Sequence, residues 1–494
     1  MNGLHRGARL FVVMAGVCLL ATEADARVGG GQGFGGGTSS PSGTGGAAGD
    51  AEAVVLLIRL LIVYPEIGVP LTLVLFGAWA WNRWVNGQDG DHVVRASGLD
   101  SSQGTTTVTG RRRTTFARLT EADPTFSAPA FIDFAQMVHA RCWAAAAAST
   151  WAPLEPFITT SARRTLDAVC SAAAPTDIVL GGITVVEVDV TARNQRVDIA
   201  MVVSMTLGEQ RIAQPATWTF TRPPGTQSLA PAVARQLGCP ACGSAVETDS
   251  LGACTSCGTP LTEGHLQWRV AEIALGPVEV LGAPLHAVQP SGVEVGATLP
   301  SVVDPDLATH MRAFQGRHPD FDLKAWEARL HHIFYALQQA WSNNRWSRAR
   351  PYTTDQVYQS FRFTLERYQE HGLANRLEEV KILKMQVVRL ELDAWYETIT
   401  VRFWARMRDF LVEIDSDTLQ GGSDRSAREM SEYWTFIRAV GSGGHSADPE
   451  CCPACGGALD NVEATGACGY CGSIITTGHF DWVLHRIDQP EAWT

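Results

Sequence analysis

The spacing of apolar residues after position 120 predicts helices first and strands afterwards, and it does so twice. Two segments place apolar side chains three or four positions apart, the period of an amphipathic helix. They carry Phe131, Phe134, Ala135, Val138 and Cys142, and then Trp326, Leu330, Ile333, Phe334, Leu337 and Trp341. The period changes to two over 183–190 and 197–205, and again over 380–392, 398–406 and 409–414, which predicts antiparallel strands. The pattern therefore indicates the α+β class.

The two helix-and-strand segments also match residue by residue. Trp151 and Pro156 pair with Trp346 and Pro351 at one constant offset, and WTFTR at 218–222 resembles WTFIR at 434–438. Each Trp–Pro break is followed by a pair of threonines, Thr159-Thr160 or Thr353-Thr354, whose hydroxyls we expect to cap a second helix. We therefore expect the body to be two copies of one unit.

Eight of the twelve cysteines form two sets of paired C-x-x-C turns. Each turn aims two thiolates at one point, and the glycine after its second cysteine permits the left-handed backbone that such a turn needs. Four sulfurs make a closed tetrahedral site, so we predict two zinc ribbons with one structural ion each. The predicted ligands are Cys239, Cys242, Cys254 and Cys257, and Cys452, Cys455, Cys468 and Cys471.

Disulfides, a redox pair and iron are the alternatives for these cysteines. Disulfides need an oxidising compartment, and a redox C-x-x-C usually stands alone. Cys451 is a spare thiol beside the second set. His265 and His479 follow the two sets, and we expect them to pack or cap rather than to bind metal. Trp268 and Trp482, three residues further on, are expected where each ribbon meets its domain.

The N-terminal part carries two apolar runs and a glycine-rich stretch. Residues 1–26 resemble a signal peptide that ends in Ala24-Asp25-Ala26, and 27–52 read as a flexible Gly/Ser-rich tail. Residues 53–84 are long and apolar enough to span a membrane. Basic residues gather on the C-terminal side of this span, so we expect the body in the cytoplasm. An uncleaved anchor and a buried hairpin are the alternatives for the two runs.

Composition and charge narrow the function. The 494-residue chain is 45% hydrophobic and carries a formal charge of −12, so nucleic acid is not an expected partner. We find no Ser-hydrolase, P-loop, zinc-protease or dinucleotide motif. His139, His331 and His332 lie on the two first helices, where histidines usually serve packing or the surface. Cys142 and Cys170 have no counterparts in the second copy.

The segment DPTFSAPAFIDFAQMVHARCW at 123–143, the Trp151–Pro156–Thr159 pattern and the EYWTFIR-type motif carry a family resemblance. They resemble the C-terminal domain family of the forty-four-kilodalton subunit of the mitochondrial inner-membrane import translocase. Its bacterial members also resemble this chain in their signal, ARVGGGQGFGG tail and membrane span. The resemblance implies cone-shaped domains of nuclear-transport-factor type with an apolar pocket, membrane association, and protein or lipid binding rather than catalysis.

Together these observations predict an order of segments and a function. We expect a non-catalytic, membrane-anchored scaffold at the cytoplasmic face of a bacterial inner membrane, with lipid and protein partners. A hydrolase or isomerase that uses the cone pocket is the alternative. The first copy has Ala144–Ala148 where the second has Gln339, Ala340, Trp341, Ser342 and Asn343, so we expect the first pocket to be more open. The expected segments are 1–26, 27–52, 53–84, a linker at 85–120, a domain at 121–235, a ribbon at 236–273, a linker at 274–317, a domain at 318–445, a ribbon at 446–487 and a tail at 488–494.

Overall fold

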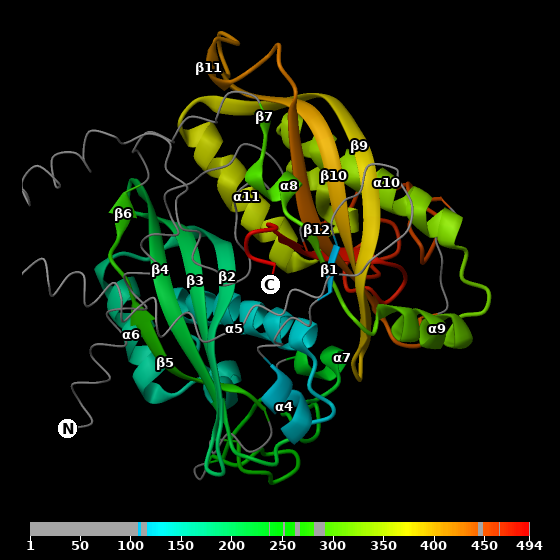
Figure 1. Ribbon diagram of the computed structural model, residues 1–494. Coiled ribbons are helices and arrows are strands. Elements are labelled where there is room, and N and C mark those ends of the chain that lie inside the picture. The colour runs from blue at the N-terminus through cyan, green and yellow to red at the C-terminus, as the bar shows by residue number, and fades with distance from the viewer. Residues whose placement is uncertain are drawn as a thin grey trace, which may run out of the picture. The chain divides into compact units, whose positions relative to one another are not determined.

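The computed structural model describes most of the chain after position 106 (Figure 1). The predicted signal, tail and membrane span lie outside the described residues. Among the residues that are described, no helix is both long and apolar enough to cross a membrane. These residues belong to one compact unit. They are 107–109, 116–236, 238–249, 252–261, 267–280, 292–442, 448–463 and 465–493.

The first half, residues 116–280, begins with helices and ends with an antiparallel sheet. Its main strands run in the order β2-β3-β4-β5, and β6 pairs with β4. Figure 1 shows α5 lying across one face of this sheet. The elements are α4 (Ala117–Ala122), α5 (Ala128–Ala148), the 3-10 turn η1 (Ala152–Phe157), α6 (Thr160–Ala172), β2 (Thr176–Val190), β3 (Gln195–Leu207), β4 (Gln210–Arg222), α7 (Pro231–Ala234), β5 (Arg269–Leu275) and β6 (Glu279–Val280).

The second half, residues 292–493, has the same order of helices, 3-10 turn and main strands. Its sheet runs β11-β10-β12-β13, with β9 beside β10 and β7 beside β12. In Figure 1 the strands β9, β10 and β12 are long and curved. The elements are β7 (Gly292–Val293), α8 (Val295–Thr298), β8 (Ser301–Val303), α9 (Leu307–Arg317), α10 (Leu323–Ser342), η2 (Trp346–Tyr352), α11 (Asp355–Glu370), β9 (Leu373–Leu392), β10 (Tyr396–Glu413), β11 (Leu419–Gly422), β12 (Arg428–Ala439) and β13 (Val483–Asp488).

The predicted α+β class is confirmed, and local residue chemistry explains several of the helix ends. Ser127 and Asp322 accept backbone N–H bonds at the starts of α5 and α10. Thr159 caps α6 as predicted, because its side chain accepts from the backbone N–H of Ala162. The equivalent prediction for Thr354 is wrong, since its side chain makes no capping hydrogen bond to α11.

The strand prediction misses the first seven residues of β2 and of β9, and it divides one strand into two. Residues 396–413 form the single strand β10, where the sequence suggested two strands with a break near Met407. The pairing of β10 with β9 shifts register between Arg406 and Arg408. Such a bulge interrupts the alternation of side chains without ending the strand, so it resembles a break in the sequence pattern.

The segments expected to be linkers and a tail belong partly to the folded body. Leu119, at the end of the expected linker 85–120, is buried in the first core, and β1 (Thr107–Thr109) pairs in parallel with β8. Phe314 of α9 is fully buried in the second core, so the expected linker 274–317 also supplies packing. In the expected tail, Trp493 is buried and stacks on Tyr433 with ring centroids 4.6 Å apart.

A buried arginine holds the segment 295–301 against the second sheet. Arg402 on β10 is fully buried, and its guanidinium donates to the carbonyl oxygens of Gly296 at 2.8 Å and Leu299 at 2.9 Å. It also donates to the Ser301 hydroxyl at 3.0 Å. A buried cation with several hydrogen bonds holds the backbone of its partners in one conformation. Residues 295–301 are therefore fixed against the sheet by Arg402.

The two halves meet where α11 packs on the first sheet. Phe363 of α11 joins Val179 and Ala213 in a small apolar cluster. The neighbouring residues Leu180 and Ile212 point to the opposite face, into the first core. At the edge of this contact, Arg211 lies 2.9 Å from Glu366.

Two adjacent glycines of β2 provide a test of this contact between the halves. A Cβ atom at Gly181 would lie 2.7 Å from the Phe363 ring, whereas one at Gly182 would meet nothing within 4 Å. We expect Gly181→Ala to lower the free energy of unfolding by about 1–3 kcal/mol through overpacking. Gly182→Ala is the matched control and should be neutral or slightly stabilising. Urea unfolding measures both variants, and equal stabilities would contradict the packing described here.

Candidate metal centres and the buried arginines beside them

Along the sequence, each cysteine cluster lies between two strands that are neighbours in one sheet. The chain leaves β4, forms the first cluster and returns as β5, which pairs with β4. It leaves β12, forms the second cluster and returns as β13, which pairs with β12. The expected ribbon segments 236–273 and 446–487 therefore end in strands of the domain sheets. Each cluster is an insertion within a sheet rather than an appendage after it.

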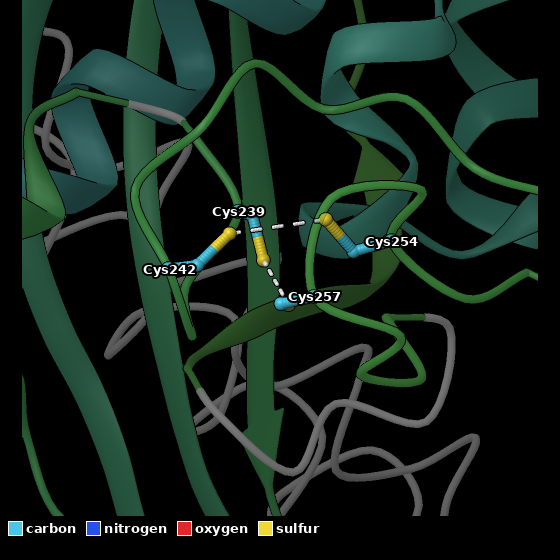
Figure 2. Close-up of side chains that lie close together, drawn as sticks. All are labelled: Cys239, Cys242, Cys254 and Cys257. Carbon is cyan, nitrogen blue, oxygen red and sulfur yellow. Dashed lines mark hydrogen bonds between the residues drawn. The ribbon is translucent and has the colours of Figure 1, made fainter.

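The first cluster brings its four sulfur atoms to one point (Figure 2). The Sγ atoms of Cys239 and Cys257 are 3.8 Å apart, and those of Cys242 and Cys254 are 3.9 Å apart. All four lie within 4.8 Å of one another. Cys239 and Cys254 are buried, and the other two are exposed. The sulfurs thus enclose a small space at the surface of the module.

The second cluster has the same geometry. The Sγ atoms of Cys452 and Cys471 are 4.0 Å apart, and those of Cys455 and Cys468 are 3.9 Å apart. Cys451 is not one of the four, and its thiol donates towards a carboxylate oxygen of Asp448 at 3.4 Å. The structure therefore brings the eight predicted cysteines together in two groups of four, as predicted, and Cys451 belongs to neither group.

These distances fit a tetrahedral metal ion. A zinc ion with Zn–S bonds of about 2.3 Å separates its sulfur ligands by roughly 3.8 Å, the edge of the tetrahedron. A disulfide would bring two sulfurs to about 2.05 Å, and all eight cysteines are free. Four thiolates in this geometry suit zinc or iron. The donor set thus fits a closed structural site.

The backbone of each turn supports the sulfurs. The glycines that follow the second cysteine of each C-x-x-C have positive φ, as predicted: Gly243, Gly258, Gly456 and Gly472. Within the first turn the N–H of Gly243 donates to the carbonyl of Cys239 at 2.8 Å. The Ser473 side chain and backbone lower the pKa of Cys471 to about 6, which favours the thiolate that binds metal.

The segment after each cluster carries a tryptophan into the domain core. Trp268 and Trp482 are buried and belong to the first and second cores. Their rings lie under two buried arginines: the Arg222 guanidinium carbon is 4.4 Å from the Trp268 ring centre, and that of Arg438 is 4.9 Å from Trp482. A cation over an indole face is attracted to it, so each arginine ties the returning chain to the sheet.

The two arginines lie at the ends of equivalent strands and have the same two partner positions. Arg222 is the last residue of β4, and Arg438 is the last but one of β12. Arg222 is paired across the sheet with Gln195, and Arg438 with Glu397. The second partner lies just before a proline at the start of each half, and it is Asp123 or His318. In the first half the carboxylate is that of Asp123, at the position before the proline. In the second half it is that of Glu397, at the position across the sheet.

Both arginines are neutralised at close range. Arg222 donates to Asp123 at 2.8 Å and to the Gln195 carbonyl oxygen at 2.6 Å. Arg438 donates to Glu397 at 2.7 Å, and the other carboxylate oxygen of Glu397 lies 2.7 Å from Nε2 of His318. Burial raises the pKa of Glu397, but the bonds from Arg438 and His318 outweigh it and lower the pKa. The pairs are thus ionised at neutral pH.

In the sequence these arginines are the last letters of WTFTR and WTFIR. Their role is not visible there because their partners are far away in the chain. The repeated arginine, followed later by a tryptophan after a cysteine set, is the signal that could have found them.

None of the candidate histidines in the described residues belongs to either group of possible metal ligands. His265 lies outside those residues, and His479 is exposed with its ring 5.4 Å from that of Phe480. His139 is buried, which lowers its pKa to about 3, and its Nε2 accepts from the indole of Trp143 at 3.1 Å. His331 is exposed, and His332 lies 2.9 Å from the hydroxyl of Tyr352.

The two remaining cysteines of the described residues, Cys142 and Cys170, are not part of such a cluster. Cys142 is buried in the first core, where burial raises the pKa of its thiol. Cys170 is half-buried, and burial and Asp167 raise its pKa. Neither environment favours a reactive thiolate.

The described residues thus define an α+β protein with curled sheets, each interrupted by a four-cysteine cluster. Residues 307–446 match the family model described as the Tim44-like domain. This match begins at the first residue of α9 and supports the resemblance for the second half of the chain, and it does not extend to the motifs of the first half. Domains of this family are in general non-catalytic, membrane-associated binding domains. No curated protein matches the chain.

Metal content gives a direct test of the two clusters. Protein purified without added metal should contain two zinc ions per chain, and Cys242→Ser or Cys455→Ser should each remove one, because a closed site needs all four thiolates. Elemental analysis measures the ratio. Cys451→Ser is the matched control and should keep both ions. Metal-free protein with oxidised cysteines would contradict this prediction.

Proposed function

We propose that this protein is a membrane-anchored, non-catalytic scaffold whose body binds proteins or lipid at the cytoplasmic face of a bacterial inner membrane. The observation that carries the proposal is the match of residues 307–446 to the Tim44-like domain. Residues 53–84 supply the expected anchor, and the basic residues after them favour a cytoplasmic body.

We further propose that the two halves are copies of one domain, each with a structural zinc ion. Their common element order and the shared partner positions of Arg222 and Arg438 support this. Zinc would supply folding free energy to a module that is too small to form a core of its own. The bonds from the four cysteine thiolates to the ion would hold the two turns of the module together. The chain's own residues then fix each module to its sheet through Trp268 and Trp482.

The alternative is a hydrolase or isomerase that uses a cone pocket. Such chemistry needs an acid and a base positioned together near a substrate. The histidine buried in the first core, His139, is neutral and bonded to Trp143. Ala145 and Ala146 of the same helix are buried in this core, and Trp341 fills the equivalent place in the second. The more open first pocket stays a prediction, and the scaffold is the better-supported function.

Reporter fusions test the proposed location. An enzyme that is active only in the periplasm, fused after Thr494, should be silent in a bacterial host, whereas a fluorescent protein that matures in the cytoplasm should be bright. Both fusions should sediment with the membrane fraction. A silent fusion is informative only if the fusion protein is present, so immunoblotting of the same cells is the control. Strong periplasmic activity would overturn the orientation.

A further inference from the structure

The second cysteine module exposes two large apolar side chains beside its metal ligands. Tyr470 is 60% exposed and Ile474 is 49% exposed. Both lie on the turn that carries Cys468 and Cys471. At the equivalent places in the first module the chain has Ser256 and Pro260. The two modules therefore share a metal-binding geometry but differ in the surface that surrounds it.

The Tyr470 ring is held in place rather than free in solvent. A Cβ atom at Gly457 would lie 3.0 Å from the ring, so the absence of a side chain there lets the ring lie on the first turn. The Tyr470 hydroxyl donates to a carboxylate oxygen of Asp460 at 3.4 Å. An aromatic side chain that is already ordered loses little conformational entropy on binding, which is typical of an anchor in an interface.

The Asp, Glu, Lys and Arg residues that this module's own sequence supplies are all acidic, and the nearby Arg350 of η2, which would lie 2.8 Å from a Cβ atom at Gly466, is buried. No Lys or Arg lies between Arg438 and Arg486 in the sequence. The acidic residues of this stretch are Asp448, Glu450, Asp460, Glu463 and Asp481. Asp481 is paired with Arg329 at 3.2 Å, while Asp460 and Glu463 lie on the exposed turn that packs beside Tyr470. The rim of the surface is thus anionic.

We propose that this surface of the second module, Tyr470 and Ile474 with the acidic rim of Asp460 and Glu463, binds a basic peptide segment of a partner protein. The occupant carries an apolar side chain that packs against Ile474 and an arginine or lysine that meets the face of Tyr470 and the rim carboxylates. Anionic phospholipid headgroups and nucleic acid are repelled by the same charges. The inference rests on the proposed function as a scaffold, and it names the class of protein partner.

Fluorescence anisotropy with the full-length, zinc-loaded protein in detergent tests the proposal. The probe is a short labelled peptide in which arginines flank two leucines. We expect saturable binding that weakens as salt rises, because the rim charges are screened. Tyr470→Ser combined with Ile474→Ser should weaken binding about tenfold or more, as loss of interface anchors does. Leu419→Ser removes an apolar side chain elsewhere that is 46% exposed, and it should leave peptide binding unchanged.

Two further measurements separate the possible failures. Asp460→Asn with Glu463→Gln keeps both apolar side chains and should weaken binding while flattening its salt dependence. Zinc analysis of every sample shows whether the module is intact, so a zinc-loaded protein that ignores the peptide overturns the docking surface and leaves the zinc proposal standing. Equal binding of a peptide with glutamates for arginines would also overturn it. The proposal would also be overturned if Tyr470→Ser with Ile474→Ser left peptide binding unchanged but reduced self-association of the protein or its binding to anionic vesicles.

Discussion

A buried arginine at the end of the third main strand is the constraint on which each half depends. A guanidinium removed from water is costly unless it is paired and hydrogen-bonded, and leaving such a charge unpaired costs about 3–5 kcal/mol. Arg222 and Arg438 are each almost completely buried. The sheet, the start of the half and the chain that returns from the cysteine cluster must all meet at this cation. It therefore fixes three distant parts of the sequence relative to one another.

The two halves satisfy this constraint with the negative charge in different places. Asp123 supplies it in the first half from the segment before α5, while Gln195 on the neighbouring strand is neutral. In the second half Glu397 on that strand carries the charge, and His318 occupies the place of Asp123. One carboxylate beside each arginine is what the physics requires, and either position can provide it. This exchange is what two diverged copies of one domain would show.

The same arrangement connects metal binding to the domain core. In the sequence each cluster lies between two strands that pair with each other, and the residue directly before the returning strand is a core tryptophan. The returning strand also meets the start of the second helix, since the N–H of Thr159 donates to Val270 and that of Thr354 donates to Leu484, both at 2.9 Å. Loss of the metal would therefore release a loop whose two ends are held by the sheet, rather than a separate appendage.

The sequence was most informative where a feature depends on neighbours in the chain. The helical period, the Trp–Pro breaks, the Thr159 cap and the cysteine turns are local, and the structure has them. The bulge in β10 was misread because a register shift and a strand end look alike in a period-two pattern. Phe314 and Trp493 were assigned to a linker and a tail because their contacts are with residues distant in sequence. The charge partners of Arg222 and Arg438 were missed for the same reason.

Exchange of the charge between the two partner positions tests the central claim most directly. Asp123→His should destabilise the first half by at least about 3–5 kcal/mol, because it leaves Arg222 buried without a carboxylate. It also removes the acceptor of the hydrogen bonds from Thr125 and Ser228, a part of the loss that a carboxylate at position 195 does not restore. Adding Gln195→Glu to this variant reproduces the second half and should recover much of the loss, and Gln195→Glu alone should not stabilise the protein to the same extent. Urea unfolding of the three variants gives the coupling energy. A double variant no more stable than Asp123→His would contradict the view that one carboxylate beside the arginine, at either position, holds each half together.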